Sequence, residues 1–474
     1  MRQAAWHASV LIAARLGASA LVRLRGFEAL SDDDYARITI AQGFSVHPRL
    51  DPTGSSWLPA PFWLEGTAMR LFGPTIATAT AVGVVAGCAS LLVLYGAARL
   101  AGVRPTAALL GSLACTLAPV AVLAGAATVP ELSVAALTAA ACLLLRAHDA
   151  RWLLASGLLL MAASLSRYEP WPACAVAAAV ALAPLLRAPR KQASWRLGAA
   201  ALALAGPCLW LAWNAYAHGH ALHFLARVAS YRNALGVVGG ISTLLSGYPR
   251  ALGAEGLPCI TALLAGLLLV RSRTALRAWA APLLAAASML LALLAADAAG
   301  GAPTHHPERA LLAVWFVGWF AAADWIDRGL HTRRLAVAAA LSAAVLVADA
   351  ARLLSMLPGY GVQRRTDLLA GAWLQAHLAP TDRVLLEPTD YGYFAVMAAA
   401  GGPQRFVIAR SIDPRSPSAS SPFEQPESLR SRAQLEGTAW VMARNRPAIG
   451  QSFELQAEVG GWQIGHRAQP NVAQ

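Results

Sequence analysis

Long apolar runs separated by short polar segments fill the first 351 residues of the chain. A helix needs about 20 apolar residues to cross the hydrocarbon core of a bilayer, and most of these runs approach that length. The pattern therefore predicts eleven membrane-spanning helices, at approximately residues 5–22, 74–98, 105–124, 130–146, 152–166, 170–187, 197–216, 256–270, 279–297, 309–326 and 335–351. The fifth and sixth runs are short and meet around two prolines, so they also fit broken helices.

The charges in the loops predict how these helices are oriented. Arginines follow the second, fourth, sixth, eighth and tenth runs, and basic loops stay on the cytoplasmic side of a membrane. The loops after the odd-numbered runs then face outward, as does the tail. The first outward loop, residues 23–73, carries five arginines against this rule, but long loops follow the rule only weakly. We expect the N-terminus inside and the C-terminus outside.

The chain changes character after residue 351, where shorter apolar and polar stretches alternate. Helical periodicity and short runs rich in β-branched or aromatic residues predict a mixed region. We expect helices at 366–378 and 391–400 and strands at 383–387, 405–409 and 438–443. The predicted architecture is a polytopic α-helical membrane domain over residues 1–351, with an acidic first outer loop, followed by a small extracytoplasmic α/β domain over 352–474.

Composition supports a membrane protein. Hydrophobic residues make up 57% of the chain and charged residues only 13%, against about 25% charged in soluble domains. The net charge of +13 comes almost wholly from arginine, and the arginines lie in short loops rather than on one basic, aromatic face, so we expect no nucleic-acid partner. The six cysteines lie in or beside apolar runs without CxxC spacing, which predicts packing residues rather than a disulfide framework.

The first outer loop opens with Ser31 followed by three carboxylates, Asp32, Asp33 and Asp34. Ionisable groups beside a membrane are candidates for a functional site. One of the aspartates can act as a general base, and Asp32 with Asp34 can hold a divalent cation such as Mg²⁺ or Mn²⁺ through hard oxygen ligands. The structural alternative is a helix N-terminus capped by Ser31 and favoured by the acidic first turn. Both interpretations can hold, and Arg37 continues the segment as a further candidate.

A second candidate group is the outward turn at Arg167, Tyr168 and Glu169. An arginine at membrane depth needs an anion, which is either Glu169 or a phosphate. Glu131 follows Pro130 at the outer start of the fourth run. It favours the helix dipole there and is also a site candidate.

The third group lies at the outer end of the tenth run, where His305, His306, Glu308 and Arg309 come together. Guanidinium matches phosphate oxygens with two parallel hydrogen bonds, so Arg309 with the histidines predicts a phosphate-binding site. This spacing is not one that zinc sites use. An ordinary solvated loop remains the structural alternative.

The acidic first loop, Glu131, the 167–169 turn and the His305 to Arg309 segment together resemble the GT-C superfamily of membrane glycosyltransferases. The likeness extends over the whole chain and is strongest to the dolichyl-phosphate-mannose and aminoarabinose-transferase-like branches. The resemblance implies that one aspartate, Asp33 above all, activates an acceptor hydroxyl while another can hold a cation. It also implies that Arg167 and Arg309, with His305 or His306, bind the phosphate of the donor. The frequent Asp-Glu pair is Asp-Asp-Asp in this chain, which leaves open which aspartate is the base.

The resemblance implies transfer of a sugar from a polyprenyl-phosphate donor to a glycan, lipid or protein acceptor. The reaction would take place at the outer face of a bacterial inner membrane, with inversion at the anomeric carbon. A ligase or polymerase that uses diphosphate-linked glycans is one alternative. A lipid or solute transporter is another, and it predicts internal repeats and charges buried at the middle of the bilayer.

Overall fold

A computed structural model describes residues 2–54, 56–147, 149–184, 190–236, 240, 247–301, 306–329, 335–357, 359–418 and 420–467. The chain forms two compact units, each assembled from separate segments. The bundle unit contains Met1–Phe27, Thr53–Pro61 and Gly83–Tyr360, and the sheet unit contains Glu28–Pro52, Phe62–Val82 and Gly361–Gln474. We describe each unit by itself.

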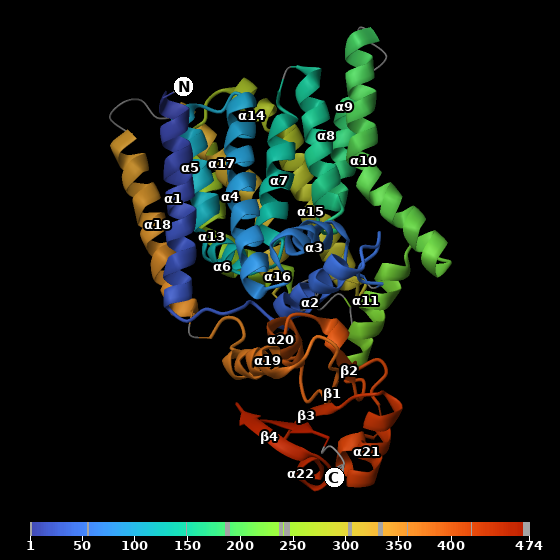
Figure 1. The fold of residues 1–474 in the computed structure, drawn as a ribbon. Helices are drawn as coiled ribbons and strands as arrows, with labels where there is room; N and C mark the ends of the chain where they lie inside the picture. Colours follow the sequence, from blue (N-terminus) through green and yellow to red (C-terminus); the bar gives the residue numbers. More distant parts are fainter. Residues whose placement is uncertain are drawn as a thin grey trace, which may run out of the picture. The chain divides into compact units, whose positions relative to one another are not determined.

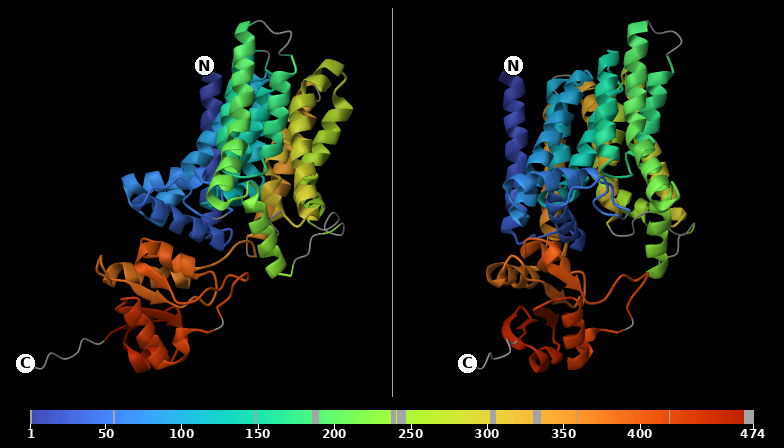
Figure 2. Two further views of the ribbon diagram at one scale, coloured as in Figure 1. Left: turned by 90° about the vertical axis from the view of Figure 1, so that its right-hand side faces the viewer. Right: turned by 45° about the vertical axis from the view of Figure 1, so that its right-hand side comes forward.

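The bundle unit is made of helices that run alongside one another in all three views (Figures 1 and 2). They are α1 (Arg2–Leu24), most of α4 (Ile76–Leu100), α5 (Pro105–Leu117), α6 (Pro119–Ala126), α7 (Glu131–Leu144), α8 (Ala150–Ser164), α9 (Trp171–Leu182), α10 (Arg190–His218), α11 (His223–Ala234), α13 (Tyr248–Leu269), α14 (Arg273–Ala278), α15 (Ala280–Ala298), α16 (Pro307–Ala310), α17 (Leu312–Gly329) and α18 (Leu335–Met356). The two short runs predicted at 152–166 and 170–187 are the separate helices α8 and α9.

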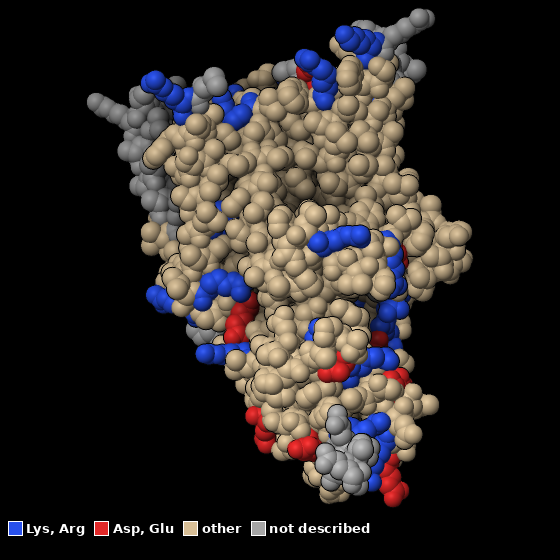
Figure 3. All heavy atoms as spheres, viewed as in Figure 1, with Lys and Arg blue, Asp and Glu red and all other residues tan. Residues whose placement is uncertain are grey.

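Several helices of the bundle are suited to a membrane. Within the described residues, five are long and apolar enough to span one, and a sixth span results if α5 and α6, which bend by 65° at a short break, are counted together. Pro119 begins α6, and a proline cannot continue the hydrogen bonding of the preceding helix. Figure 3 shows almost no charged side chains on the middle of this unit's visible surface. The expected count of eleven spans and their orientation stay predictions.

Small residues let helices of the bundle pack closely. A Cβ atom added to Gly157 of α8 would lie 2.6 Å from the carbonyl oxygen of Ala199 in α10. One added to Gly206 of α10 would lie 2.0 Å from Oγ of Ser164. Such close backbone approach through glycine and alanine is typical of helices that associate inside membranes, and it explains the alanine-rich composition of these runs.

The sheet unit contains a five-stranded sheet of order β2-β1-β3-β5-β4. β1 (Val384–Leu386) pairs in parallel with β2 (Phe406–Ile408) and β3 (Trp440–Arg444), and β5 (Trp462–His466) pairs antiparallel with β3 and with β4 (Glu454–Val459). The remaining elements are α19 (Arg365–His377), α20 (Tyr393–Ala399), α21 (Pro426–Leu435), α22 (Ala448–Ser452) and the short 3₁₀ helices η2 (Pro403–Arg405) and η3 (Pro422–Glu424).

The three predicted strands and two predicted helices of this region are confirmed as β1, β2, β3, α19 and α20. The hairpin of β4 and β5 went unpredicted. Its turn uses Gly460 and Gly461, both at positive φ, a conformation that glycine adopts without strain. β4 is mostly exposed and carries two glutamates, so it lacks the apolar run by which a buried strand is recognised.

The two helices that follow α1 belong to the sheet unit, which differs from the boundary expected at residues 351/352. They are α2 (Asp32–Val46) and α3 (Ala60–Phe72), the latter apart from its first two residues. Tyr35, Ile38 and Ala41 of α2 form one buried cluster with residues of α20, and Gln42 donates a hydrogen bond of 2.8 Å to the carbonyl oxygen of Ala398. The apolar face of α2 is therefore buried against α20, which lies next to it in Figure 1.

Candidate active site

The three carboxylates Asp32, Asp33 and Asp34 form the first turn of α2, and we call them the acidic turn. Asp34 is only 2% exposed. Its Oδ2 accepts hydrogen bonds from the backbone N–H groups of Leu30 at 3.1 Å and Ser31 at 3.2 Å. These bonds satisfy donors that a helix start leaves open, so Asp34 holds the entrance to α2 in place as the capping alternative predicts.

Asp32 is held by an arginine from the C-terminal region of the chain. Arg364 donates through Nε and Nη2 to the two carboxylate oxygens of Asp32, each at 2.8 Å. This two-bond geometry is the strong form of an arginine–carboxylate pair. The charge of Asp32 is therefore compensated within the sheet unit.

Asp33 differs from both neighbours. Its side chain is exposed, and no described residue forms a hydrogen bond or ion pair with it. Of the acidic turn, Asp33 is the carboxylate that is available to a reacting group. The resemblance put Asp33 forward as the base, and that role stays a prediction.

A buried carboxyl group that the sequence did not single out lies beside the acidic turn. Glu65 of α3 is 5% exposed. Burial raises its pKa to about 8, against the opposing effect of Arg37 and with a further rise from Asp34. The guanidinium of Arg37 lies 5.6 Å from the centre of the Phe62 ring. Arg37, a site candidate from the sequence, therefore takes part in the packing between α2 and α3. The sequence did contain a signal for Glu65, because it carries a carboxyl group within the mostly apolar segment 60–72.

Arg167 is the centre of a charged group in the bundle unit. Its Nε and Nη2 donate to the carboxylate of Glu169 at 2.5–3.0 Å, and its Nη1 donates to Glu131 at 2.6 Å. Nη1 of Arg309 lies 3.5 Å from the same oxygen of Glu131. We call these four residues the arginine–glutamate group. It brings together four site candidates from three separate segments, namely Glu131, the 167–169 turn and the segment of Arg309.

The charges of the arginine–glutamate group balance, because two guanidinium groups face two carboxylates. Glu131 and Arg309 are buried, at 2% and 9% exposure. Nε of Arg309 is buried without a hydrogen-bond partner among the described residues. A buried donor left unpaired costs free energy, so an additional anion would be stabilised at Arg309.

Tyr168 and His306 have partners of their own. The Tyr168 hydroxyl donates to the carbonyl oxygen of Ser56 at 2.7 Å, and the ring stacks on Phe224 with centres 4.5 Å apart. His306 donates to Glu308 at 3.0 Å, and Tyr360 also donates to Glu308. Burial raises the pKa of Glu308, but these two hydrogen bonds outweigh it and lower the pKa. His305 lies outside the described residues.

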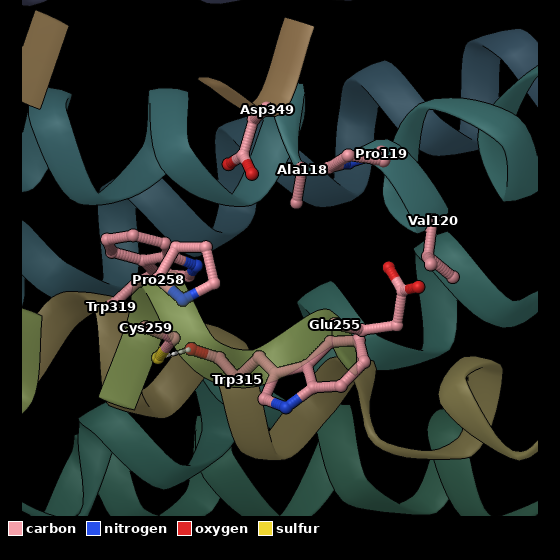
Figure 4. Close-up of a pocket in the computed structure, with 9 residues that line it drawn as sticks. All are labelled: Ala118, Pro119, Val120, Glu255, Pro258, Cys259, Trp315, Trp319 and Asp349. Carbon is pink, nitrogen blue, oxygen red and sulfur yellow. Dashed lines mark hydrogen bonds between the residues drawn. The ribbon is translucent and has the colours of Figure 1, made fainter. Parts of the chain in front are cut away.

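A separate hollow in the bundle unit also went unpredicted. The carboxylates of Glu255 and Asp349 point toward it, and Trp315, Trp319 and residues 118–120 complete much of its lining (Figure 4). Arg352 pairs with Glu255. Ionisable groups are therefore present inside helices α13 and α18. They were not predicted from the sequence, where only the charges at the ends of loops were considered.

The chemistry of the two groups is complementary, although each belongs to its own unit. The acidic turn offers one free carboxylate, which can accept a proton. The arginine–glutamate group offers guanidinium donors, which suit phosphate oxygens. Within the described residues, no group of three or more His, Cys, Asp or Glu side chains is placed to hold a metal ion. A cation shared by Asp32 and Asp34 would have to displace Arg364 from Asp32.

Comparisons with known proteins show what the chain is similar to. Residues 47–213 match the family model described as dolichyl-phosphate-mannose-protein mannosyltransferase. The structure of ArnT from Cupriavidus metallidurans bound to undecaprenyl phosphate is similar over 96% of this chain and 97% of that one, with a TM-score of 0.62 and 14% identity. The apo structure of the same ArnT gives a TM-score of 0.59, 15% identity and coverage of 95% and 96%. No curated protein matched the sequence.

These likenesses confirm the resemblance inferred from the motifs. The match to the ArnT structures covers nearly the full length of both chains, so it includes the helical bundle and the C-terminal sheet together. The chain has the fold of the ArnT structures.

Proposed function

We propose that the chain is a glycosyltransferase that moves a sugar from a polyprenyl-phosphate donor to an acceptor hydroxyl at the extracytoplasmic face of a bacterial inner membrane. The observation that carries the proposal is the acidic turn, in which Asp32 and Asp34 are held by partners while Asp33 remains free. The full-length likeness to an ArnT that was solved with undecaprenyl phosphate supports a lipid phosphate as part of the donor.

The proposed reaction needs a base and a cationic site. Asp33 accepts the proton of the acceptor hydroxyl while that oxygen attacks the anomeric carbon of the donor. The bond between this carbon and the phosphate oxygen breaks, and polyprenyl phosphate leaves with the bonding electron pair. Attack from the side opposite the leaving group inverts the anomeric carbon. A positioned carboxylate and guanidinium groups that stabilise the departing phosphate supply the main catalytic effects.

Arg167 and Arg309 are the proposed phosphate ligands, with His306 and His305 as additional candidates. Nε of Arg309 offers an unused donor, and Arg167 can exchange a glutamate oxygen for a phosphate oxygen because both accept the same paired N–H groups. Glu131 and Glu169 then keep the guanidinium groups oriented before the donor arrives. Because the N–H groups of these guanidinium side chains are already oriented, little free energy is lost to reorganisation when negative charge develops on the phosphate.

A divalent cation held by Asp32 and Asp34 remains a prediction. Asp34 already accepts two backbone N–H groups and Asp32 already binds Arg364, so such an ion would replace existing contacts. Chelation of divalent ions tests this directly. Loss of transfer in EDTA with recovery on adding Mn²⁺ or Mg²⁺ would support the cation, and unchanged transfer would remove it.

The testing experiment measures sugar transfer by purified protein in liposomes. Radiolabelled polyprenyl-phosphate sugars serve as donors, and a bacterial membrane extract serves as the pool of acceptors. We expect one donor to label the extract and Asp33→Asn to lower that rate by at least about a hundredfold, as for loss of a general base. Equal rates for wild type and Asp33→Asn would refute the role of Asp33.

Two other outcomes distinguish the alternatives. Transfer only from diphosphate-linked oligosaccharides would indicate a ligase or polymerase. Absence of transfer from any donor, with folded protein, would favour a transporter, for which Glu255 and Asp349 in the hollow of the bundle unit are the groups to examine.

A further inference from the structure

Arg364 occupies a central place in the sheet unit. It lies at the N-terminal end of α19, and its guanidinium meets three carboxylates. It donates to both oxygens of Asp32 at 2.8 Å and to Asp390 at 3.2 Å, and it lies 3.7 Å from Asp367. Its side chain is 17% exposed and that of Asp32 is 21% exposed, so this pair is partly shielded from screening by salt, whereas Asp390 is 48% exposed.

The backbone around Arg364 is tied to the start of α2 as well. The N–H of Arg364 donates to the carboxylate of Glu28 at 2.7 Å. Two residues earlier, Val362 donates to the carbonyl oxygen of Ala29 at 3.0 Å in an antiparallel bridge. Three separate links therefore join residues 361–364 to residues 28–32, immediately before Asp33.

Arg364 is itself fixed by the interior of the C-terminal domain. Asp367, one helical turn along α19, is 1% exposed. Its Oδ1 accepts a hydrogen bond of 2.8 Å from Nε1 of Trp462 in β5 and another from Arg444 in β3. A continuous chain of charges and hydrogen bonds thus runs from the sheet through Asp367 and Arg364 to Asp32. Such networks hold a side chain in one geometry more firmly than a single pair does.

We propose that Arg364 is a positioning residue for the sugar transfer: it clamps Asp32 and thereby sets the first turn of α2 so that Asp33 alone presents a free carboxylate. The inference rests on the proposed function. Three consecutive carboxylates repel one another. Without the guanidinium of Arg364 to offset this repulsion, the turn would be held less firmly, by the backbone hydrogen bonds of Asp34. Asp32 would also become a second free carboxylate beside the base, in competition for the acceptor hydroxyl.

This role predicts a particular kinetic effect. Arg364 acts through Asp32 and not on the donor, so its loss should lower kcat and leave the KM for the donor nearly unchanged. A misplacement of about 1 Å in a reacting group can cost roughly a hundredfold in rate. We therefore expect a fall in kcat of about that size for Arg364→Ala. Arg364→Lys, which keeps the charge but not the paired geometry, should fall between Arg364→Ala and wild type.

The chain offers a matched control in the next residue. Arg365 has the same charge, is exposed and forms no hydrogen bond or ion pair with a described residue, so Arg365→Ala should transfer sugar at the wild-type rate. Asp32→Asn removes the same clamp from the other side. The double variant Asp32→Asn/Arg364→Ala should then be no slower than the slower of its two single variants, since both changes abolish one shared interaction.

The experiment compares these variants in liposomes for kcat, donor KM and amide hydrogen exchange over residues 28–36. Faster exchange there in Arg364→Ala and Asp32→Asn, but not in Arg365→Ala, together with the kcat loss, is the expected result. Wild-type kcat in Arg364→Ala or Asp32→Asn would overturn the inference. So would a rise in donor KM without loss of kcat. If Arg364→Ala does not fold, Asp32→Asn and Arg364→Lys decide the question on the same measurements.

Failure of the proposed function has a different signature. If wild type transfers no sugar, the proposed reaction is wrong whatever Arg364 does, and hydrogen exchange still reports whether Arg364 holds the first turn of α2. Unchanged exchange in Arg364→Ala would then refute the clamp itself.

Discussion

The arginine–glutamate group of the bundle unit and the acidic turn of the sheet unit treat charge in opposite ways. In the first, two guanidinium groups face two carboxylates, so the charges balance before any ligand arrives. In the second, backbone N–H groups bind Asp34 and Arg364 binds Asp32, while Asp33 has no partner among the described residues. The difference means that a ligand meets an exposed carboxylate at Asp33, whereas an anion at the arginines would have to replace a glutamate oxygen or use the unused Nε of Arg309.

This difference predicts different consequences of mutation. Loss of the free carboxylate removes a chemical step. Removal of one partner from a balanced, buried group leaves its other charges uncompensated, which is strongly unfavourable.

Within the arginine–glutamate group, the largest effect is expected from Arg167→Ala. This change leaves Glu169 and Glu131 without their main cation and removes a charge-assisted contact to the donor phosphate, which is worth about 1.5–3 kcal/mol. Together these losses should lower kcat/KM for the donor about a hundredfold, mainly through KM. Arg151→Ala is the matched control, because Arg151 forms an exposed pair with Asp149 and such pairs contribute little.

Kinetics in liposomes, with thermal unfolding of each variant, test this prediction. A folded Arg167→Ala protein with wild-type kcat/KM would show that the arginine–glutamate group is a structural ion-pair network. Phosphate binding would then have to be sought elsewhere in the bundle unit.

The helices of the bundle could be predicted from the sequence, because the thickness of the bilayer sets the length of the apolar run that a spanning helix needs. The parallel strands of the tail were also accessible, since they are short and apolar. The assignment of α2 and α3 to the sheet unit was not. The apolar face formed by Tyr35, Ile38 and Ala41 looks the same in sequence whether it lies on lipid or on α20. Only the tertiary partner distinguishes these cases.

The candidate site follows the same rule. Glu169 lies two residues from Arg167, so their pairing was one of the two alternatives drawn from the sequence, whereas Glu131 lies 36 residues away and was not expected as a partner. The sequence pointed to Asp33 by resemblance alone. The physical reason for its availability, the clamp on Asp32, depends on an arginine 332 residues distant. A charge pattern indicates that partners are needed but does not reveal which distant residue supplies them.

The next prediction concerns the pH dependence of stability and the buried carboxyl group of Glu65, in contrast to the exposed carboxylate of Asp33. Burial raises its pKa to about 8 in the folded protein, against an ordinary value of 4.5. The folded state therefore holds this proton more tightly than the unfolded state. The free energy of unfolding should fall as pH rises from about 4.5 to about 8, by at most about 1.4 kcal/mol per pH unit from this group, and then level off.

Glu65→Gln removes this titration while keeping the size of the side chain. We expect the variant to gain stability relative to wild type between pH 5 and pH 8, as measured by thermal unfolding across that range. Glu454→Gln on exposed β4 is the control and should follow wild type. Parallel curves for wild type and Glu65→Gln would mean that Glu65 is ionised in the folded protein and paired with Arg37.

The smallest effect is expected from Glu131→Gln, which sharpens the idea of a balanced group. The amide oxygen can still accept from Nη1 of Arg167, so the geometry is retained while the group gains one positive charge. A phosphate donor should then bind more tightly, and its KM should fall about threefold, or roughly 0.6 kcal/mol, with kcat little changed. Glu169→Gln changes the charge by the same amount beside Arg167 alone, so comparison of the two variants isolates the contribution of Arg309. A rise in donor KM for Glu131→Gln would mean that the carboxylate charge is needed to orient both arginines. A collapse of kcat at unchanged KM would place Glu131 among the reacting groups, and the two regions would no longer divide binding from proton transfer.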